Sequence, residues 1–179
     1  MNDWITPDDK NWTWVLERRC DDCGFDAASF DPLRTGEALR DQVVRWEAVL
    51  ATDRVRERPR QDVWSPLEYG CHVRDVFRKF DDRLALMLGT NDPAFENWDQ
   101  DATAIEDRYD LQDPVTVAGE LDAAGTTLAS RFDTVSGAQW ERRGFRSDGS
   151  VFTVASIARY LMHDPVHHLW DVGAEAPHF

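Results

Sequence analysis

Residues 65–87 carry the clearest helix signal in the chain, and they read SPLEYGCHVRDVFRKFDDRLALM. The first four residues are typical of a capping box with proline at the first helical position, because serine and glutamate side chains can bind the free backbone amides there. Apolar side chains then recur at helical spacing along one wide stripe, namely Tyr69, Val73, Val76, Phe77, Phe80, Leu84 and Met87. Gly89 and Asn91 end the pattern. The stretch therefore predicts a long amphipathic helix.

Three more helices are expected from the same kind of pattern. One begins near Thr35 and ends before Pro59. Another opens at Asp113, which is a favourable N-cap followed by proline, and the last runs from Thr153 to about Val172. Four amphipathic helices with one long crossover predict an all-α fold, a four-helix bundle.

Three other segments complete the expected organisation. Residues 90–112 are polar, and they form either a functional lid or a simple crossover between distant helix ends. Residues 142–146 and 151–153 flank Ser-Asp-Gly, a hairpin signal that predicts a short β-ribbon before the last helix. Residues 1–34 have no sustained period, so we expect an N-terminal extension laid on a bundle of residues 35–179.

The composition narrows the functional classes. The chain has 179 residues, of which 42% are hydrophobic and 30% charged, a balance typical of one globular domain. Its 34 acidic and 20 basic residues give a formal net charge of −14, which argues against a nucleic-acid partner. No apolar run is long enough for a membrane span and no secretory signal opens the chain, so we expect a cytoplasmic protein without a membrane partner.

Histidines supply the first candidate for a functional site. His163 and His167 lie four residues apart on the predicted last helix, so both imidazoles project from one face, as two ligands of one metal ion do. His168 falls on the expected core stripe of that helix, and His72 lies at the edge of the apolar stripe of the second helix. We predict a metal site formed by His72, His163 and His167. The alternative is that these are hydrogen-bonded core or surface residues without a metal.

Such a site would be catalytic in type, because three imidazoles leave coordination positions of the metal open. Zn²⁺, Ni²⁺ and Fe²⁺ all suit imidazole ligands. Asp164 and Asp171 are candidates for accepting the distal N–H of a ligand, and Tyr160 for contacting a substrate in the pocket. The zincin helix motif is matched poorly, since Asp164 stands where that motif has glutamate, and a protease is therefore disfavoured.

The three cysteines allow several interpretations. Cys20-x-x-Cys23-Gly resembles half of a zinc knuckle, whose missing ligands would come from His178, an acidic residue or another chain. The same two residues could instead be a redox-active thiol pair, or reduced thiols that pack the extension. Cys71 is expected to be a small buried side chain.

Some of these segments resemble a known family. Residues 64–76, WSPLEYGCHVRDV, resemble the second-helix signature of the DinB/YfiT-like metal-binding superfamily. The His-x-x-x-His of residues 163–167 is similar to its closing signature, and the Arg-Ser-Asp-Gly of residues 146–149 is similar to its ribbon. The resemblance covers roughly residues 35–172. Residues 12–26 lie outside it and resemble a feature of an actinobacterial DinB-like subgroup.

The resemblance implies a four-helix bundle that holds a divalent metal through three histidines, which at the matching positions are His72, His163 and His167. Similar family members include thiol-dependent transferases and isomerases that use mycothiol or bacillithiol, and the chain resembles the N-terminal domain of mycothiol-dependent maleylpyruvate isomerase in this respect. Homodimers are common in the family, so a homodimer is expected here.

The leading functional hypothesis is therefore a metal-dependent enzyme, an S-transferase, isomerase or hydrolase. It would activate a low-molecular-weight thiol or a water for transfer to a small electrophilic substrate. A non-catalytic stress-response protein that binds a metal or a small ligand is the alternative, and a redox switch through Cys20 and Cys23 is a third hypothesis.

Overall fold

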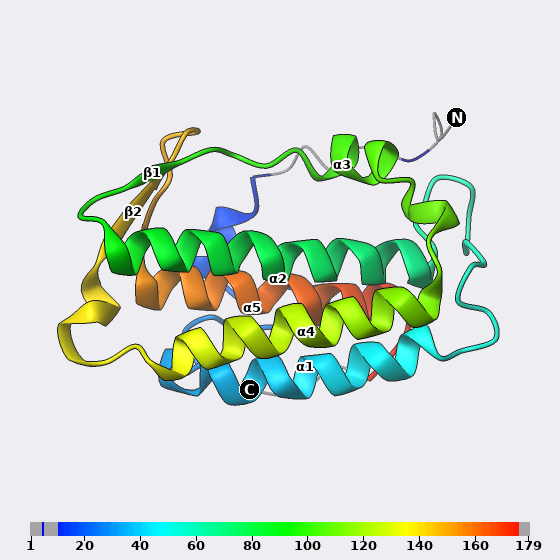
Figure 1. The fold of residues 1–179 in the computed structure, drawn as a ribbon, viewed down its shortest axis with the longest axis horizontal. Helices are drawn as coiled ribbons and strands as arrows, with labels where there is room; N and C mark the ends of the chain where they lie inside the picture. The colour runs from blue at the N-terminus through cyan, green and yellow to red at the C-terminus, as the bar shows by residue number, and fades with distance from the viewer. Residues whose placement is uncertain (1–4, 6–10, 176–179) are drawn as a thin grey trace.

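The computed structural model describes residue 5 and residues 11–175 of the chain. Four long helices run side by side in it, α1 (Thr35–Leu50), α2 (Pro66–Gly89), α4 (Pro114–Asp133) and α5 (Val154–Asp171) (Figure 1). α1 and α2 each pack against both α4 and α5, so α1 and α2 occupy opposite corners of the bundle although they are consecutive along the chain. The expected all-α four-helix bundle is confirmed.

The helices begin where the sequence places their caps. The Ser65 hydroxyl accepts the amide of Glu68 at 3.3 Å, and the Glu68 carboxylate accepts the amide of Ser65 at 2.8 Å. Thr153 and Ser156 form the same reciprocal box at the start of α5, and Asp113 caps α4. These contacts lie within one turn of the chain, which is why the helix starts could be predicted from the sequence.

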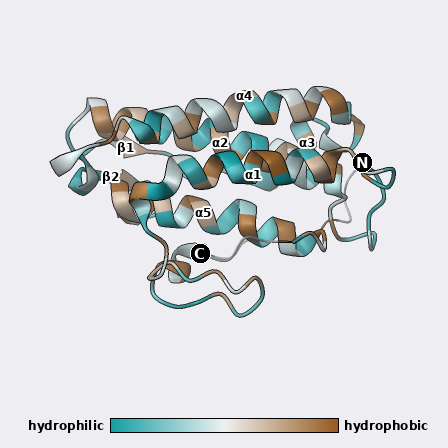
Figure 2. Ribbon diagram, turned by 90° about the horizontal axis from the view of Figure 1, so that it is seen from below, coloured by the Kyte–Doolittle hydropathy of each residue, from teal (hydrophilic) through white to brown (hydrophobic). Residues whose placement is uncertain are grey.

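The four helices enclose one apolar core. Each helix contains both hydrophobic and hydrophilic residues along its length (Figure 2). The largest fully buried side chains include Trp46 of α1, Phe77 of α2, Leu128 of α4 and Leu161 of α5. In the described part of the chain, none of the helices combines the length and the apolar character that crossing a membrane requires.

α4 lies close to α1 and α2 at Gly125. A Cβ atom there would lie 2.4 Å from Val43 of α1 and 3.2 Å from the ring of Phe77 of α2. We expect Gly125→Ala to be less stable than Gly119→Ala by about 1–3 kcal/mol, because a methyl group overpacks the first site. A Cβ atom at Gly119 would meet no described heavy atom within 4 Å, so alanine there gains helix propensity at no steric cost. Urea unfolding of both variants measures the difference, and equal stabilities would contradict the close packing of α4.

The long crossover between α2 and α4 contains structure that the sequence did not predict. It holds β1 (Ala94–Phe95), α3 (Gln100–Glu106) and η3 (Tyr109–Leu111). Tyr109 is fully buried, and its hydroxyl donates to Asp75 of α2 at 2.6 Å. The crossover is therefore fixed to the bundle at its end.

The predicted ribbon is present and carries one additional strand. β2 (Arg143–Arg146) pairs antiparallel with β3 (Val151–Thr153), as expected. β1 adds to β2 in a parallel orientation. A strand of two residues is too short to show a period in the sequence, which explains why it was missed.

The N-terminal segment lies along α5, and its short helices are η1 (Trp12–Leu16) and η2 (Pro32–Arg34). The segment buries Val15, Cys20, Phe25 and Phe30. It thus brings two of the three cysteines to the helix that carries most of the histidines.

Candidate metal centre

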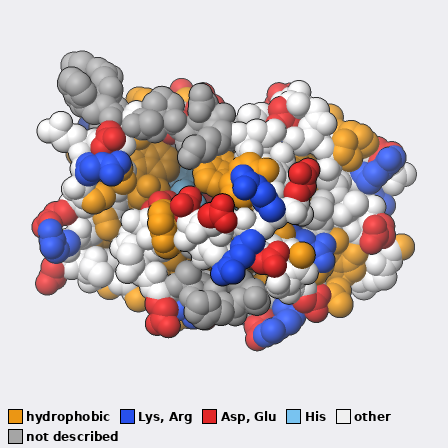
Figure 3. All heavy atoms as spheres, turned by 180° about the vertical axis from the view of Figure 1, so that it is seen from behind, with side chains coloured by type: hydrophobic (Ala, Val, Ile, Leu, Met, Phe, Trp, Pro, Cys, Tyr) orange, Lys and Arg blue, Asp and Glu red, His pale blue; other side chains and the backbone are white. Residues whose placement is uncertain are grey.

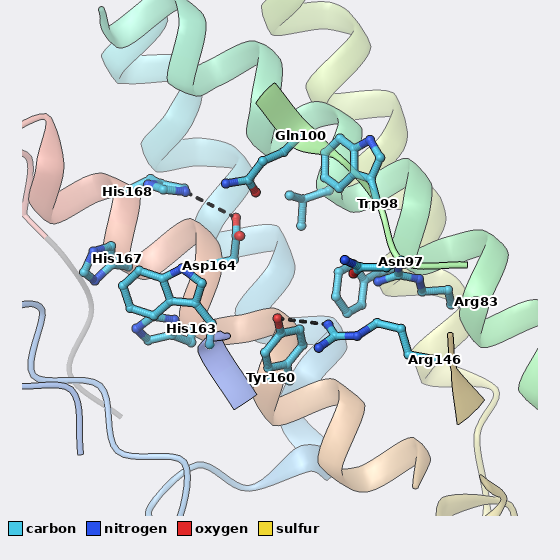
Figure 4. A pocket seen from close by; sticks show the side chains of 13 residues that line it. Arg83, Asn97, Trp98, Gln100, Arg146, Tyr160, His163, Asp164, His167 and His168 are labelled. Atoms are coloured by element: carbon cyan, nitrogen blue, oxygen red, sulfur yellow. Dashed lines mark hydrogen bonds and ion pairs between the residues drawn. The ribbon is translucent and has the colours of Figure 1, made fainter. Parts of the chain in front are cut away.

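α5 presents four side chains of the types that can bind metals, and they form two neighbouring pairs. His163 and His167 face the N-terminal segment, whereas Asp164 and His168 face α2 (Figure 4). Both pairs have the i, i+4 spacing, and the pairs are offset by one residue, which turns them about 100° apart around the helix.

The structure divides the expected trio of His72, His163 and His167. Among the described residues, His72 shares a cluster with Asp164 and His168, and the three offer ligand atoms within 4.8 Å of one another. His163 and His167 belong to a different cluster. The sequence pattern placed His168 on the core stripe of α5. For this reason the predicted metal site contained His163 and His167 instead of His168. The face of α5 that carries His168 meets α2 at His72, whose ring centroid is 4.9 Å from that of His168.

The carboxylate of Asp164 lies between the two imidazoles. Its Oδ2 is 3.4 Å from His72 Nε2, and its Oδ1 is 3.8 Å from His168 Nε2. His72 itself is fully buried, and the rings of Trp64 and Trp98 each have their centroids 5.4 Å from its own. Trp98 stacks on the imidazole at an interplanar angle of 4°, so the orientation of this ring is fixed.

Hydrogen bonds around the cluster orient some of its atoms and leave others without a partner. His168 Nδ1 donates to Asp171 Oδ2 at 2.7 Å, which fixes the orientation of this imidazole. His72 Nδ1 and Asp164 Oδ1 are buried without a hydrogen-bond partner among the described residues. Asp171, expected to orient a ligand, thus contacts His168 more closely than His167, whose Nε2 is 3.9 Å away.

The ionisation of Asp164 also suits a cation site at this cluster. Burial by itself would raise the pKa of Asp164, but the neighbouring His72 and His168 outweigh burial and lower this pKa to about 2. The carboxylate is therefore ionised at neutral pH. Two imidazoles and one carboxylate form a donor set known for zinc and for non-haem iron, and three protein ligands leave positions open. The residues present thus fit a divalent metal.

A cavity opens beside this cluster, with a volume of about 80 Å³, several times the roughly 10–15 Å³ that one water needs. Its wall includes Trp12 and Trp98 as well as Tyr160, the residue expected to contact a substrate. From outside, histidine atoms are visible in a hollow between hydrophobic side chains (Figure 3). The wall of the cavity is therefore mixed, with aromatic side chains next to charged and polar groups.

The far side of the cavity carries two buried arginines, which sequence reasoning missed (Figure 4). Arg146 pairs with Asp148 at 2.7 Å and donates to the Tyr160 hydroxyl at 3.2 Å. Arg83 forms no ion pair with any carboxylate of the described residues, and it donates to the carbonyl of Glu96 at 3.0 Å. Burial, helped by the charge of Arg146, lowers the pKa of Arg83 to about 10. Its position within the apolar stripe of α2 was the available sequence signal.

The second cluster joins the N-terminal segment to α5. Cys20, Cys23, His163 and His167 offer ligand atoms that all lie within 4.8 Å of one another. From the sequence, the missing partners of the cysteines were expected in His178, which lies outside the described residues, or in an acid or another chain. No disulfide links the cysteines in the described part of the chain, and Cys71 is buried as expected.

Burial favours the neutral forms in this second cluster. It raises the pKa of the Cys23 thiol to about 12, and it lowers the pKa of His163 to about 3 with help from neighbouring His167. The Trp12 ring covers the pair of imidazoles, with its centroid 5.3 Å from that of His163 and 5.1 Å from that of His167.

Comparison with known proteins places the bundle in a family. A family model described as the DinB superfamily matches residues 35–172. The chain belongs to this superfamily. Its fold is similar to that of a solved structure described as "YfiT from Bacillus subtilis is a probable metal-dependent hydrolase with an unusual four-helix bundle topology". That match has a TM-score of 0.69 and 17% identity, and it covers 79% of this chain and 87% of YfiT. No curated protein sequence matches.

In this DinB-superfamily protein, the side chains grouped with His72 differ from the three histidines that the resemblance implied. The side chains that lie with His72 are the carboxylate of Asp164 and the imidazole of His168, and His163 and His167 lie in the other cluster. The two cysteines of the second cluster precede residues 35–172, the part of the chain that the family model matches. The two histidines of that cluster lie within it.

Proposed function

We propose that this protein is a metal-dependent enzyme whose divalent ion is held by His72, Asp164 and His168. In this proposal, the site activates a water or a low-molecular-weight thiol for attack on a small electrophile that carries an anionic group. The observation that carries the proposal is the meeting of these three donors beside a cavity. Asp164 and His168 line this cavity, and two buried arginines lie on its other side.

The donor set supports Zn²⁺, with Fe²⁺ and Ni²⁺ as the other ions that suit it. A divalent ion in these positions supplies Lewis-acid chemistry, because it lowers the pKa of a water or thiol that binds to it. Asp171 orients His168 through Nδ1, and the stacked Trp98 holds the ring of His72. These contacts keep the ligand atoms directed at one point before the ion binds.

The remaining side chains of the cavity act on the substrate. Arg83 is buried without a carboxylate partner among the described residues, so an anionic group of the substrate can pair with its guanidinium. Burial raises the pKa of Tyr160, which keeps its hydroxyl protonated and able to donate at neutral pH. Arg146 holds this hydroxyl in place. The electrophilic centre would thus lie between the arginine end and the His72 cluster.

A panel of small electrophiles tests this function. Protein loaded with Zn²⁺, Fe²⁺ or Ni²⁺ is incubated with anionic esters, amides and unsaturated acids, in water alone and with low-molecular-weight thiols. We expect turnover of at least one anionic compound, loss of turnover after chelation, and recovery when the ion is returned. Absence of turnover across the panel by protein that demonstrably holds the metal would contradict an enzymatic role and favour a non-catalytic binding protein.

A further inference from the structure

The Cys20, Cys23, His163 and His167 cluster is not used by the function proposed above. Its order along the chain is Cys-x-x-Cys followed by His-x-x-x-His, a ligand spacing of the kind found in Cys₂His₂ zinc sites. Cys20, His163 and His167 are buried and Cys23 is half-buried, so the cluster lies beneath the surface. All four are soft or borderline ligands, which distinguishes this set from the carboxylate-containing set around His72.

The distances fit a tetrahedral ion. With zinc–sulfur and zinc–nitrogen bonds of about 2.3 and 2.0 Å, ligand atoms of a tetrahedral site lie roughly 3.3–3.8 Å apart. Cys20 Sγ lies 3.7 Å from His167 Nδ1, and every pair in the cluster lies within 4.8 Å. The four ligands therefore need to move by about an ångström or less to enclose an ion.

The backbone of residues 20–25 already has the shape of a turn around two sulfur atoms. The amide of Cys20 donates to the carbonyl of Phe25 at 2.8 Å, and the amide of Gly24 donates to the carbonyl of Cys20 at 3.0 Å. Gly24 has a φ of 76°, a left-handed conformation that glycine adopts without strain. Both thiols are thus held on the side of the turn that faces α5.

One buried polar atom of the cluster lacks a hydrogen bond. His163 Nε2 has no hydrogen-bond partner among the described residues. Aromatic rings surround this imidazole, with centroids of Trp12, Trp14 and Phe25 at 5.3, 6.4 and 5.9 Å. A buried polar atom without a partner is destabilising, and coordination to a metal would remove that penalty.

We propose that Cys20, Cys23, His163 and His167 bind a structural Zn²⁺ with all four coordination positions filled by the protein. This ion fastens the N-terminal segment to α5 and thereby holds Trp12 in the wall of the cavity. The four ligands are distinct from His72, Asp164 and His168, so either proposal can fail without the other.

Metal counting and cobalt substitution test the site. Protein produced with Zn²⁺ is expected to carry about two ions per chain, and Cys23→Ser about one. Co²⁺-substituted protein should show thiolate-to-cobalt charge transfer in the near ultraviolet, absent from Cys23→Ser and retained by His72→Ala. Cys71→Ala, which removes a buried thiol outside the cluster, is the matched control and should keep both the ion and the absorption band.

A measurement on the unmodified protein covers the case in which Cys23→Ser does not fold. The Cys20 and Cys23 thiols should react slowly with a thiol reagent in zinc-loaded protein and rapidly after chelation. Absence of the cobalt–thiolate band from the wild type, thiol reactivity that is unchanged by chelation, or a disulfide between these cysteines in the purified protein would overturn the proposal.

Discussion

Asp164→Ala is expected to release the ion beside His72 and to lower kcat/KM by about 10²–10⁴-fold, because metal Lewis acidity contributes several kcal/mol of transition-state stabilisation. Asp164 is the anionic donor of the cluster, and its carboxylate lies between the imidazoles of His72 and His168. Without it, two neutral rings would have to hold a doubly charged ion. The metal content and the kinetics of the variant measure the two effects.

Asp82→Ala is the matched control for this variant. Asp82 is an exposed residue of α2, so its removal makes the same change in net charge away from the cavity. We expect this control to keep both the metal and the activity. Retention of the metal and of full activity by Asp164→Ala would refute its role as a ligand. The cobalt–thiolate band of the second site should survive in Asp164→Ala, which separates loss of one ion from unfolding.

Arg83→Met is expected to raise KM for an anionic substrate by about 10–150-fold, the equivalent of a charged hydrogen bond of roughly 1.5–3 kcal/mol. Arg83 is 5% exposed and its guanidinium has no carboxylate partner among the described residues, so its charge is available to a ligand. Methionine keeps much of the length of the side chain and its packing against Phe80 and Phe95. Steady-state kinetics with an anionic substrate and its uncharged analogue measure the effect.

The comparison between the two substrates is the decisive part of that experiment. Arg143→Met serves as the control, because Arg143 is exposed and pairs with Asp92 on the outside of the sheet. An equal loss with the charged and the uncharged substrate would show that Arg83 has a structural role instead of recognising an anion.

The helices could be predicted because their signals are local. Ser65, Asp113 and Thr153 bind amides within their own first turns, and the apolar stripe of α2 is periodic over nearly the whole length of the helix. The short strand β1 and the helix α3 escaped prediction because their position depends on pairing with the ribbon and on packing against α2.

The site could be predicted only in part, because a step of one residue on α5 decides which neighbour a side chain meets. The sequence contains two interleaved pairs, His163 with His167 and Asp164 with His168, and periodicity alone does not say which pair faces His72. Only the packing of α2 against α5 settles that choice. The partners of Cys20 could not be predicted either, because the sequence of the N-terminal segment has no helical period that would indicate its position.

Anomalous diffraction from crystals grown with Zn²⁺ would locate the ion and identify its ligands in one experiment. We expect a peak bonded to an imidazole nitrogen of His72, the carboxylate of Asp164 and His168 Nε2, at distances of about 2.0–2.2 Å. A peak that His72 shares with His163 and His167, or the absence of any ion beside Asp164, would refute the proposed metal centre.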